Sequence, residues 1–423
     1  MNWPTHPEYK NSGVQWLGEV PAHWGLMPMF TVGHERALTN TGLSETNLLS
    51  LSYGRIVRKD IDTTDGLLPA SFDTYQIVEP CDIVFRFTDL QNDKRSLRSA
   101  LVPERGIITS AYMAFSPTQI DPKYFSYLMR SYDLTKVFYS RGGGLRQSLK
   151  YEDVKRLPIL VPPTDEQRDI SRFLDRETAK IDALIDKQEQ LIATLREDRA
   201  ATITHAVTKG LDASVERRDS QVDWIGNIPA HWEISKGTWI GTPFGSPAVP
   251  EDDVSTTGDR AFLKVSSLSA SGFSPEDPEW FVNSTYRADS DFITFPKRGA
   301  AIFTNKVNVV DFPAVIDPNL MGWKMLPGHN AYYYAFIIGT LRLDEIADVS
   351  SVPQLNTKHV ASLRLPRPPV NEQQDIVNFL HEQCRKIDSL IDKSTEMIET
   401  LREYRSALIT NAVTGKIDVR EAV

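Results

Sequence analysis

The chain of 423 residues carries a second copy of itself. The words WLGEVPAHW at residues 16–24 and WIGNIPAHW at residues 224–232 are offset by 208 residues. A second pair, VPPTDEQRDISRFL from Val161 and RPPVNEQQDIVNFL from Arg367, is offset by 206 residues. This period is far longer than the roughly 20 to 50 residues of a solenoid repeat. It therefore predicts two domain-sized copies related by an internal pseudo-two-fold axis.

The likeness between the copies is uneven. Between residues 25–150 and 233–356 the matching words vanish, whereas the segments around these two inserts stay recognisable. Close to the end of each insert the match resumes, since Leu149 and Val154 lie 206 residues before Leu355 and Val360. A shared frame thus carries two inserts of one fold with different surfaces. This pattern predicts a scaffold that presents two recognition surfaces of the same type but different specificity.

Composition limits the class of protein. Apolar residues make up 41% of the chain and charged residues 24%, which is ordinary for a soluble globular protein, and this length predicts about 2 to 4 domains. No apolar run reaches the length of a membrane span, and the N-terminus lacks a signal-peptide layout, so we expect a cytoplasmic protein. Cys81 and Cys384 have no CxxC partner, which argues against a disulfide framework or a cysteine metal site.

The net charge of −9 is unfavourable for a non-specific nucleic-acid coat. The inserts differ, because residues 26–150 contain 15 Lys and Arg against 13 Asp and Glu, whereas residues 233–360 contain 10 against 15. A concave basic patch inside one domain is compatible with these counts. If the chain binds DNA, partners must therefore supply much of the affinity for phosphate.

Each PP-containing word opens a predicted helix of about 40 residues, or on the order of 60 Å. Thr164 and Asn371 follow double prolines as candidate N-caps, and Gln167 has the spacing of a capping box. Isoleucine and leucine then recur at steps of three and four residues, which is typical of a coiled-coil seam. The predicted seam consists of Ile170, Leu174, Ile181, Leu184, Leu191 and Leu195 in the first helix and Ile376, Leu380, Ile387, Leu390, Met397 and Leu401 in the second.

Two seams of equal length and phase predict that the helices pair in antiparallel orientation within one chain, because this buries both apolar stripes. The pair would then act as a ruler between the inserts. A homodimeric coiled coil between two chains is the alternative.

The inserts are predicted to be mixed α/β domains. Short apolar runs broken by turn residues indicate strands at 75–87 and 106–117 and again at 291–310, and an apolar helix follows in each insert from Pro122 and Asn330. The predicted fold class is α+β, with two similar mixed α/β domains separated by two long antiparallel coiled-coil helices. The expected segments are 1–25, 26–160, 161–215, 216–232, 233–366 and 367–423, in which 26–160 and 233–366 are the two variable domains.

Together these features resemble the DNA specificity (S) subunit of type I restriction-modification systems. The likeness covers essentially the full chain. It lies in WLGEVPAHW, in the PPTDEQ entry to a long helix, in GGGLRQSLKYEDVKRLPI from Gly142, and in the alternation of two variable domains with two repeated helical regions.

The resemblance implies that each variable region is a target recognition domain that reads one half of a bipartite, asymmetric DNA sequence, and that the helices set the spacer. It implies two methyltransferase subunits, which use S-adenosylmethionine to methylate adenine, and two restriction subunits, which translocate DNA with ATP and Mg²⁺. It also implies that this chain itself has no catalytic centre, cofactor or metal, and no membrane contact.

The residues agree with a chain that is not an enzyme. We find neither the [DNS]PP[FYW] signature of an adenine methyltransferase nor a GxxxxGK[ST] phosphate loop. The charged triplet Glu152, Asp153 and Lys155 is more typical of a solvated helix turn than of a nuclease centre. A structural coiled-coil adaptor and a self-sufficient nuclease or methyltransferase remain as rival classes, but the first leaves two divergent domains unexplained and the second lacks its motifs.

The histidines do not predict a metal site. His23 and His231, in the repeated PAHW words, are expected to pack beside Trp24 and Trp232, since no second ligand stands at metal-binding spacing.

Candidate DNA contacts are basic and amide side chains in polar, turn-rich segments of the inserts, since guanidinium and ammonium groups bind phosphate and amides read base edges. In the second insert, Pro353-Gln354 replaces the glycine-rich loop of the first, which leaves the role of that loop's backbone open. The candidates are Arg55, Arg58, Lys59, Arg86, Gln91, Asn92, Lys94, Arg95, Arg98, Arg141, Arg146 and Gln147 in the first insert, and Lys264, Lys297, Arg298, Asn305, Lys306, Asn308, Gln354 and Asn356 in the second.

A further apolar flank on the predicted helices suggests where a partner docks. Ile185, Ile192, Ile391 and Ile398 widen the stripe beyond what a two-helix pair can cover. We expect a methyltransferase subunit to bind this flank in each half.

Overall fold

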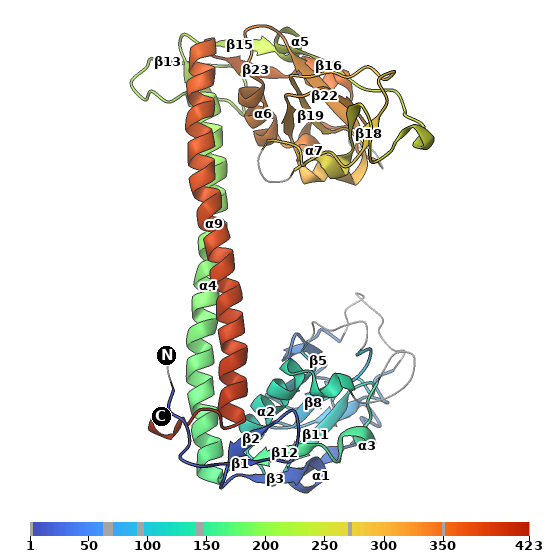
Figure 1. Ribbon diagram of the computed structural model, residues 1–423, viewed down its shortest axis with the longest axis vertical. Coiled ribbons are helices and arrows are strands. Elements are labelled where there is room, and N and C mark those ends of the chain that lie inside the picture. Colours follow the sequence, from blue (N-terminus) through green and yellow to red (C-terminus); the bar gives the residue numbers. More distant parts are fainter. Residues whose placement is uncertain are drawn as a thin grey trace. The chain divides into compact units, whose positions relative to one another are not determined.

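The computed structural model describes residues 3–61, 71–90, 97–140, 148–269, 273–348 and 352–422. It divides into two units, Met1–Glu189 with Glu396–Val423, and Gln190–Thr395. Each unit contains one PAHW word, one insert and part of each long helix (Figure 1). Among the described residues, no helix is both long enough and apolar enough to span a bilayer.

The first unit begins with the hairpin of β1 (Tyr9–Asn11) and β2 (Glu19–Pro21). Strand β3 (Gly25–Pro28) then pairs with β12 (Pro158–Val161), so the insert leaves and rejoins the frame through one antiparallel ladder. The remaining strands are β4 (Gly33–Arg36), β5 (Leu49–Ser52), β6 (Arg55–Arg58), β7 (Gln76–Val78), β8 (Ile83–Phe85), β9 (Ser99–Leu101), β10 (Gly106–Ile108) and β11 (Met113–Pro117). The helices are α1 (Met29–Val32), α2 (Pro122–Leu134) and α3 (Tyr151–Val154).

The second unit repeats this plan. The hairpin is β13 (Arg217–Asp219) with β14 (Asn227–Pro229), and β15 (Glu233–Lys236) pairs with β23 (Arg364–Arg367). The other strands are β16 (Gly241–Phe244), β17 (Arg260–Leu263), β18 (Phe281–Val282), β19 (Phe292–Pro296), β20 (Asn308–Val310), β21 (Ala314–Ile316) and β22 (Leu320–Met325). The helices are α5 (Gly237–Ile240), α6 (Ala331–Thr340), α7 (Leu343–Ile346) and α8 (Thr357–Ser362).

Both inserts have the same sheet, as the resumption of matching positions predicts. Its strand order is β4-β11-β8-β9 in the first unit and β16-β22-β19-β20 in the second, antiparallel throughout. Helices α2 and α6 occupy equivalent places in the chain and are largely buried. Asp121 and Asn330 cap these helices, since their side-chain oxygens accept hydrogen bonds from the amides of Tyr124 and Tyr332 at 2.9 Å.

The long helices are α4 (Thr164–Lys209) and α9 (Val370–Val413). They run antiparallel in each unit, as predicted: Arg405 of α9 pairs with Asp182 of α4 in the first unit, and Arg199 of α4 pairs with Asp388 of α9 in the second. Both helices begin slightly earlier than the sequence predicts. Because Thr164 and Asn371 already lie inside them, the predicted N-cap roles of these two residues are wrong.

The predicted seam is correct at its start and wrong further along. Ile170, Leu174, Ile376 and Leu380 are buried, but four later members of the seam are 44–49% exposed: Leu184, Leu191, Leu390 and Met397. In the first unit the helices meet along Asp182, Ile185 and Glu189 of α4, because Asp182 and Glu189 form ion pairs with Arg405 and Arg402. Neighbouring residues on a helix point about 100° apart, so a contact through Ile185 turns Leu184 outwards.

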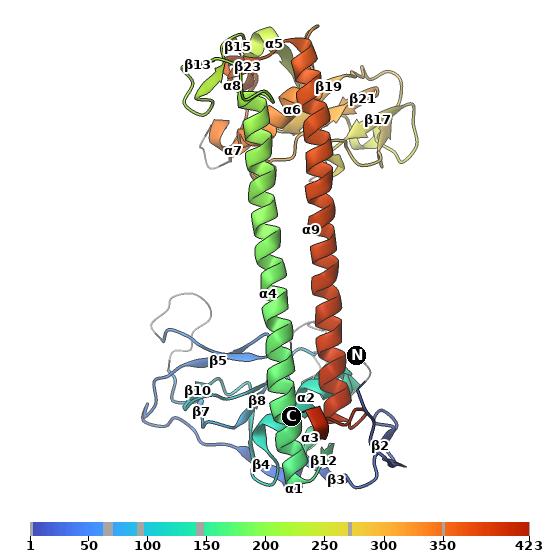
Figure 2. The same cartoon turned by 90° about the vertical axis from the view of Figure 1, so that its left-hand side faces the viewer.

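The two chain ends meet in the first unit (Figure 2). The amide of Asp418 donates to the carbonyl of Pro4 at 2.7 Å, and the hydroxyl of Tyr9 donates to the carbonyl of Gly415 at 3.0 Å. In the second unit the chain runs without interruption from α4 into β13 at the equivalent place. Non-covalent contacts in one unit thus replace a covalent link in the other.

Candidate nucleic-acid interface

In each unit, hydrogen bonds among three side chains join the segment just before the insert to the first turn of a long helix. In the first unit, Glu166 accepts from the indole Nε1 of Trp24 at 2.9 Å and lies 2.8 Å from Nε2 of His23. A carboxylate only accepts, so the imidazole is the donor. Trp24 is 1% exposed, and a buried indole N–H needs such a partner.

The second unit has the same arrangement. Glu372 accepts from Nε1 of Trp232 at 2.8 Å and lies 2.7 Å from Nε2 of His231. This explains why PAHW and the Glu-Gln pair at the start of each long helix occur in both copies. We refer to both triads, His23-Trp24-Glu166 and His231-Trp232-Glu372, as the His-Trp-Glu clasps.

Two further contacts attach each insert helix to the frame. Gln167 accepts from the amide of Asp121 at 2.7 Å, and Gln373 accepts from that of Asn330 at 2.8 Å, so the predicted capping glutamine instead joins two helix starts. The hydroxyl of Tyr124 donates to the carbonyl of Val413, and that of Tyr333 donates to Val207. Burial raises the pKa of both phenols well above the usual value, so they stay neutral donors.

The frame brings candidate loops together in the second unit. The amide of Gly299 donates to Pro353, and the amide of Leu355 donates to Lys297, both at 2.9 Å. The turn that carries Lys297 and Arg298 therefore lies against the loop that carries Gln354. Arg298 and Gln354 are exposed and form an isolated antiparallel β-bridge through their backbones. Partial burial lowers the pKa of the Lys297 ammonium.

The first unit makes the equivalent contact. The amide of Leu149 donates to the carbonyl of Phe87 at 3.0 Å, which joins the segment after β8 to the segment before α3. Seven sequence candidates lie in these two segments but outside the described residues: Gln91, Asn92, Lys94, Arg95, Arg141, Arg146 and Gln147. The pairing of two loops is therefore a property of both inserts, while the residues on the loops differ between them.

Comparison with known proteins gives two relatives from Methanocaldococcus jannaschii. The specificity subunit of the type I restriction enzyme MjaX is 23% identical over 312 residues, which is 71% of this chain and 69% of the relative. The specificity subunit of the type I restriction enzyme MjaVIII is 20% identical over 341 residues, or 75% of this chain and 76% of the relative. No family model matches the sequence.

Solved structures share the fold. A chain from a study of complex assembly and conformational transition of the type I R-M system has a TM-score of 0.74 at 15% identity, covering 93% of this chain and 98% of that one. The HsdS subunit from Thermoanaerobacter tengcongensis has a TM-score of 0.55 at 14% identity, covering 94% and 98%. The chain is thus similar in sequence to type I restriction enzyme specificity subunits and shares the fold of solved chains from type I restriction-modification systems.

Four of the candidate DNA-contact residues have structural roles instead. Arg98 is fully buried, and its guanidinium donates to the carbonyl of Thr88 at 2.9 Å. Asn308 is fully buried and accepts from the amide of Ser269 at 2.8 Å. Asn356 caps α8. The amide group of Asn305 is bonded on both sides, donating to Gly339 and accepting from Leu343. A fully buried side chain, or an amide whose oxygen or nitrogen is already bonded within the fold, is not available to a base edge, so these four predictions are corrected.

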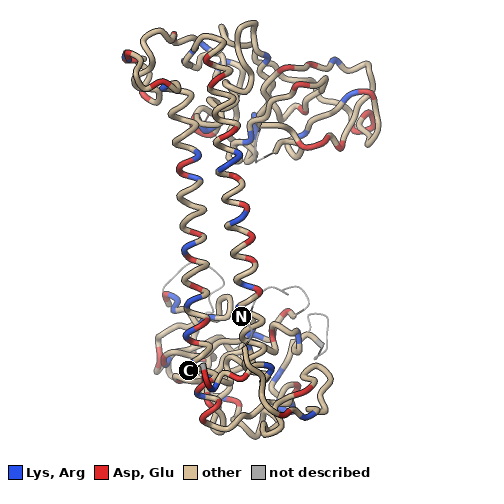
Figure 3. Tube along the Cα trace, turned by 60° about the vertical axis from the view of Figure 1, so that its left-hand side comes forward, with Lys and Arg blue, Asp and Glu red and all other residues tan. Residues whose placement is uncertain are grey.

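Other candidates are more accessible. Arg55 and Lys59 are exposed, and so is Arg58, although it is paired with Glu104. Arg86 and Lys264 are half-buried, and the ammonium group of Lys264 lies 4.1 Å from the centre of the Trp280 ring. Acidic and basic residues are interspersed along the chain trace of both units (Figure 3). This agrees with the mixed charges counted from the sequence.

The predicted partner flank is also corrected. Ile185, Ile192 and Ile398 are 6–9% exposed, and Ile391 is half-buried, so these side chains belong to the buried side of the helices. The exposed apolar residues are Leu184 and Leu191 on α4 and Leu390 and Met397 on α9. We call these four residues the leucine stripe. Sequence pattern alone shows two adjacent apolar stripes and does not show which of them the helix pair buries.

A group of potential metal ligands was missed by the sequence analysis. His6, His23 and Glu166 offer atoms within 4.8 Å of one another. Glu166, however, already bonds Trp24, and the guanidinium of Arg420 lies 3.7 Å from its other oxygen, which disfavours a cation. Since no additional histidine joins the clasp of the second unit among the described residues, we interpret the His23-Glu166 pair as structural.

Proposed function

We propose that this chain is the DNA-binding specificity subunit of a type I restriction-modification complex, in which each recognition domain reads one half of a bipartite, asymmetric target. The single observation that carries the proposal is the duplicated attachment. The same His-Trp-Glu clasp and the same loop pairing hold two domains whose loops differ in sequence. A frame that holds unlike loops in like positions suits a target with unlike halves.

The proposed division of labour leaves chemistry to partners. Methyltransferase subunits would bind S-adenosylmethionine and methylate adenine, and restriction subunits would use ATP and Mg²⁺, whereas this chain would supply sequence recognition alone. Its net charge of −9 supports this arrangement, because affinity for phosphate then comes largely from the assembled complex. The proposed stoichiometry of two methyltransferase and two restriction subunits is the one that the resemblance implies, and the pseudo-two-fold repeat is compatible with one methyltransferase subunit in each half.

The leucine stripe is the proposed docking surface of the methyltransferase subunits. Leu184 corresponds to Leu390 and Leu191 to Met397 at the repeat offset of 206, so each half has one copy of the surface. All four side chains remain 44–49% exposed on helices that already bury an isoleucine face. Large exposed apolar residues in a repeated, matched pair are typical of an interface with a repeated partner.

A domain exchange tests the function. The recognition domain at residues 26–150 is replaced by that of another specificity subunit, with Gly25 and the β12 segment kept. A map of N6-methyladenine in cells that carry the exchanged protein should show one half of the methylated motif changed and the other unaltered. If both halves change together, the two domains do not read independently and the proposal fails. Exchange of residues 233–356 is the matched control and should alter the other half.

A further inference from the structure

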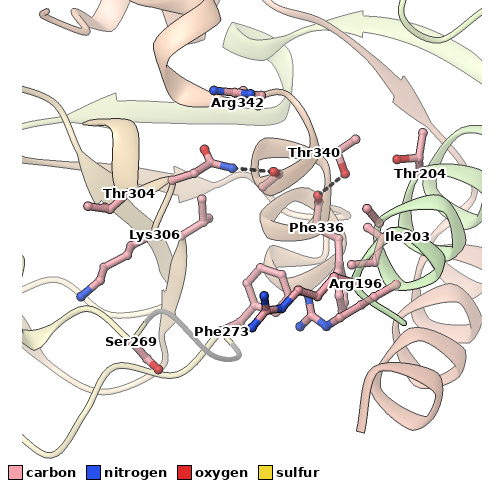
Figure 4. A pocket seen from close by; sticks show the side chains of 15 residues that line it. Arg196, Ile203, Thr204, Ser269, Phe273, Thr304, Lys306, Phe336, Thr340 and Arg342 are labelled. Carbon is pink, nitrogen blue, oxygen red and sulfur yellow. Dashed lines mark hydrogen bonds between the residues drawn. The ribbon is translucent and has the colours of Figure 1, made fainter. Parts of the chain in front are cut away.

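A cationic cavity lies inside the second unit, between α4 and the recognition domain (Figure 4). Its volume is about 530 Å³. One wall is α4, and the others are the end of α6 and the segment before β20. Four cationic side chains line it, namely Arg196, Arg199, Lys306 and Arg342, and no carboxylate does among the described residues.

Two of these four cations, Arg196 and Lys306, have no carboxylate partner among the described residues, whereas Arg199 and Arg342 do. Arg199 pairs with Asp388 at 3.0 Å, and Arg342 pairs with Asp344 at 2.9 Å. Lys306 only donates to the carbonyl of Leu268, which leaves its charge uncompensated. Arg196 is exposed and has no ion pair within the described chain; in Figure 4 it extends from α4 towards Phe273. The cavity therefore has a net positive lining that the protein itself does not balance.

The first unit provides an internal comparison. At the repeat offset of 206, Arg402 and Arg405 correspond to Arg196 and Arg199, and they line a cavity of about 410 Å³. There Arg402 pairs with Glu189 at 3.2 Å and Arg405 pairs with Asp182 at 2.9 Å. The counterpart of Glu189 in the second unit is Thr395. The repeat thus retains the arginine and loses its carboxylate.

The cavity is also less filled in the second unit. Arg130 of α2 lines the first cavity and donates to the carbonyls of Gly54 and Ser99 at 2.6 and 2.9 Å. Tyr124 and Tyr333 make equivalent contacts, and alignment on them places Gly339 of α6 opposite Arg130. Gly339 has no side chain to enter the cavity, and a Cβ atom there would meet nothing closer than Phe273 at 4.0 Å.

We propose that the cavity of the second unit binds a phosphate group. A tetrahedral phosphate anion fits a lining with an unpaired guanidinium and an ammonium group, because Arg and Lys donate several charge-assisted hydrogen bonds to phosphate oxygens. The phosphate belongs either to a DNA backbone or to a free nucleotide. In the first case the inference rests on the proposed function and assigns one of its phosphate contacts; in the second it is independent of that function.

Equilibrium titration of the full chain with ATP and with a short DNA duplex of arbitrary sequence tests the proposal. Arg196→Gln removes the unpaired cation, and Thr395→Glu restores the carboxylate that the first unit has. Each should weaken binding of the same probe about tenfold. Arg402→Gln is the matched control in the first unit and should leave that affinity within twofold. Circular dichroism checks that the long helices remain folded in all three variants.

The two probes separate the sources of phosphate. Weakened duplex binding, with a salt dependence reduced by about one phosphate contact, identifies a DNA backbone phosphate. Weakened ATP binding with unchanged duplex binding identifies a free nucleotide. The proposal is overturned if neither probe responds to either variant, or if Arg402→Gln has the same effect as Arg196→Gln. The domain exchange described above can succeed in either case, so failure of this proposal is distinguishable from failure of the function.

Discussion

The His-Trp-Glu clasp of the first unit should stabilise that unit measurably. In Glu166→Ala the indole N–H of Trp24, which is 1% exposed, loses its acceptor. An unsatisfied buried donor costs about 1–3 kcal/mol, and a hydrogen bond to a charged group contributes about 1.5–3 kcal/mol. We therefore expect Glu166→Ala to lower the free energy of unfolding by about 2–3 kcal/mol. Glu166→Gln retains an acceptor oxygen and should cost about 1 kcal/mol.

Comparison of the two clasps makes the expectation sharper. The Glu372 side chain is 38% exposed, against 11% for Glu166, so water can replace part of what Glu372→Ala removes. We expect that substitution to cost about 1 kcal/mol. For a unit of this size, about 1 kcal/mol shifts the melting temperature by about 2–4 °C, so Glu166→Ala should lower the first unit's transition by about 5–10 °C.

Scanning calorimetry measures the shift, and hydrogen exchange locates it. Peptides around β2 and the start of α4 should exchange faster in Glu166→Ala, whereas peptides of the second unit should be unchanged. A double-mutant cycle with Trp24→Phe isolates the pair, and we expect a coupling energy of about 1 kcal/mol or more. Strictly additive effects, or equal shifts in Glu166→Ala and Glu166→Gln, would refute the reasoning, because the clasp would then not depend on the indole hydrogen bond.

Three other outcomes are expected. Leu184→Asp with Leu390→Asp should abolish co-purification of the methyltransferase subunit without loss of helicity. Gln190→Asp, at an exposed position of α4 that points about 120° away from Leu184, should not; retained stoichiometry in the double variant places docking elsewhere. Insertion of four residues after Thr194 and of four after Ser394 lengthens both long helices by about 6 Å. The methylated motif should then gain one or two unspecified bases between unchanged halves, and an unaltered spacer would contradict the hypothesis that the helices set the spacer length. Burial lowers the pKa of His6, so its neutral form is favoured in the folded state, and stability that is present above pH 6.5 should be lost as the pH falls below this value. Calorimetry at pH 7.5 and 5.5 should show that His6→Gln reduces this loss. An identical loss in the variant would rule out His6 as the cause.

Sequence analysis predicted the frame better than the surfaces that the frame presents. The repeated words predicted two units, the long helices and their antiparallel pairing, because each word coincides with a buried contact such as Trp24 with Glu166. The choice between Leu184 and Ile185 depends on a rotation of about 100° between two apolar residues, which periodicity resolves poorly. Arg98 and Asn308 were misassigned because a polar residue in a polar segment gives no sign of burial. His6 joins Glu166 only through tertiary structure.

The repeat allows one copy to be compared with the other, position by position. Where both copies agree, the residue has a buried partner, as with Gln167 and Gln373, each bonded to the first turn of an insert helix. Where they differ on exposed loops, the difference suits unlike targets. The cavities fall in neither group. In the second unit Thr395 stands where the first has Glu189, and Gly339 stands where the first has Arg130. The arginine that pairs with Glu189 is retained as Arg196. The second unit therefore keeps this cation but lacks its carboxylate partner and the side chain of Arg130. A change that leaves a guanidinium unpaired next to open volume brings no stability to the unit, and a ligand that supplies the missing negative charge accounts for it.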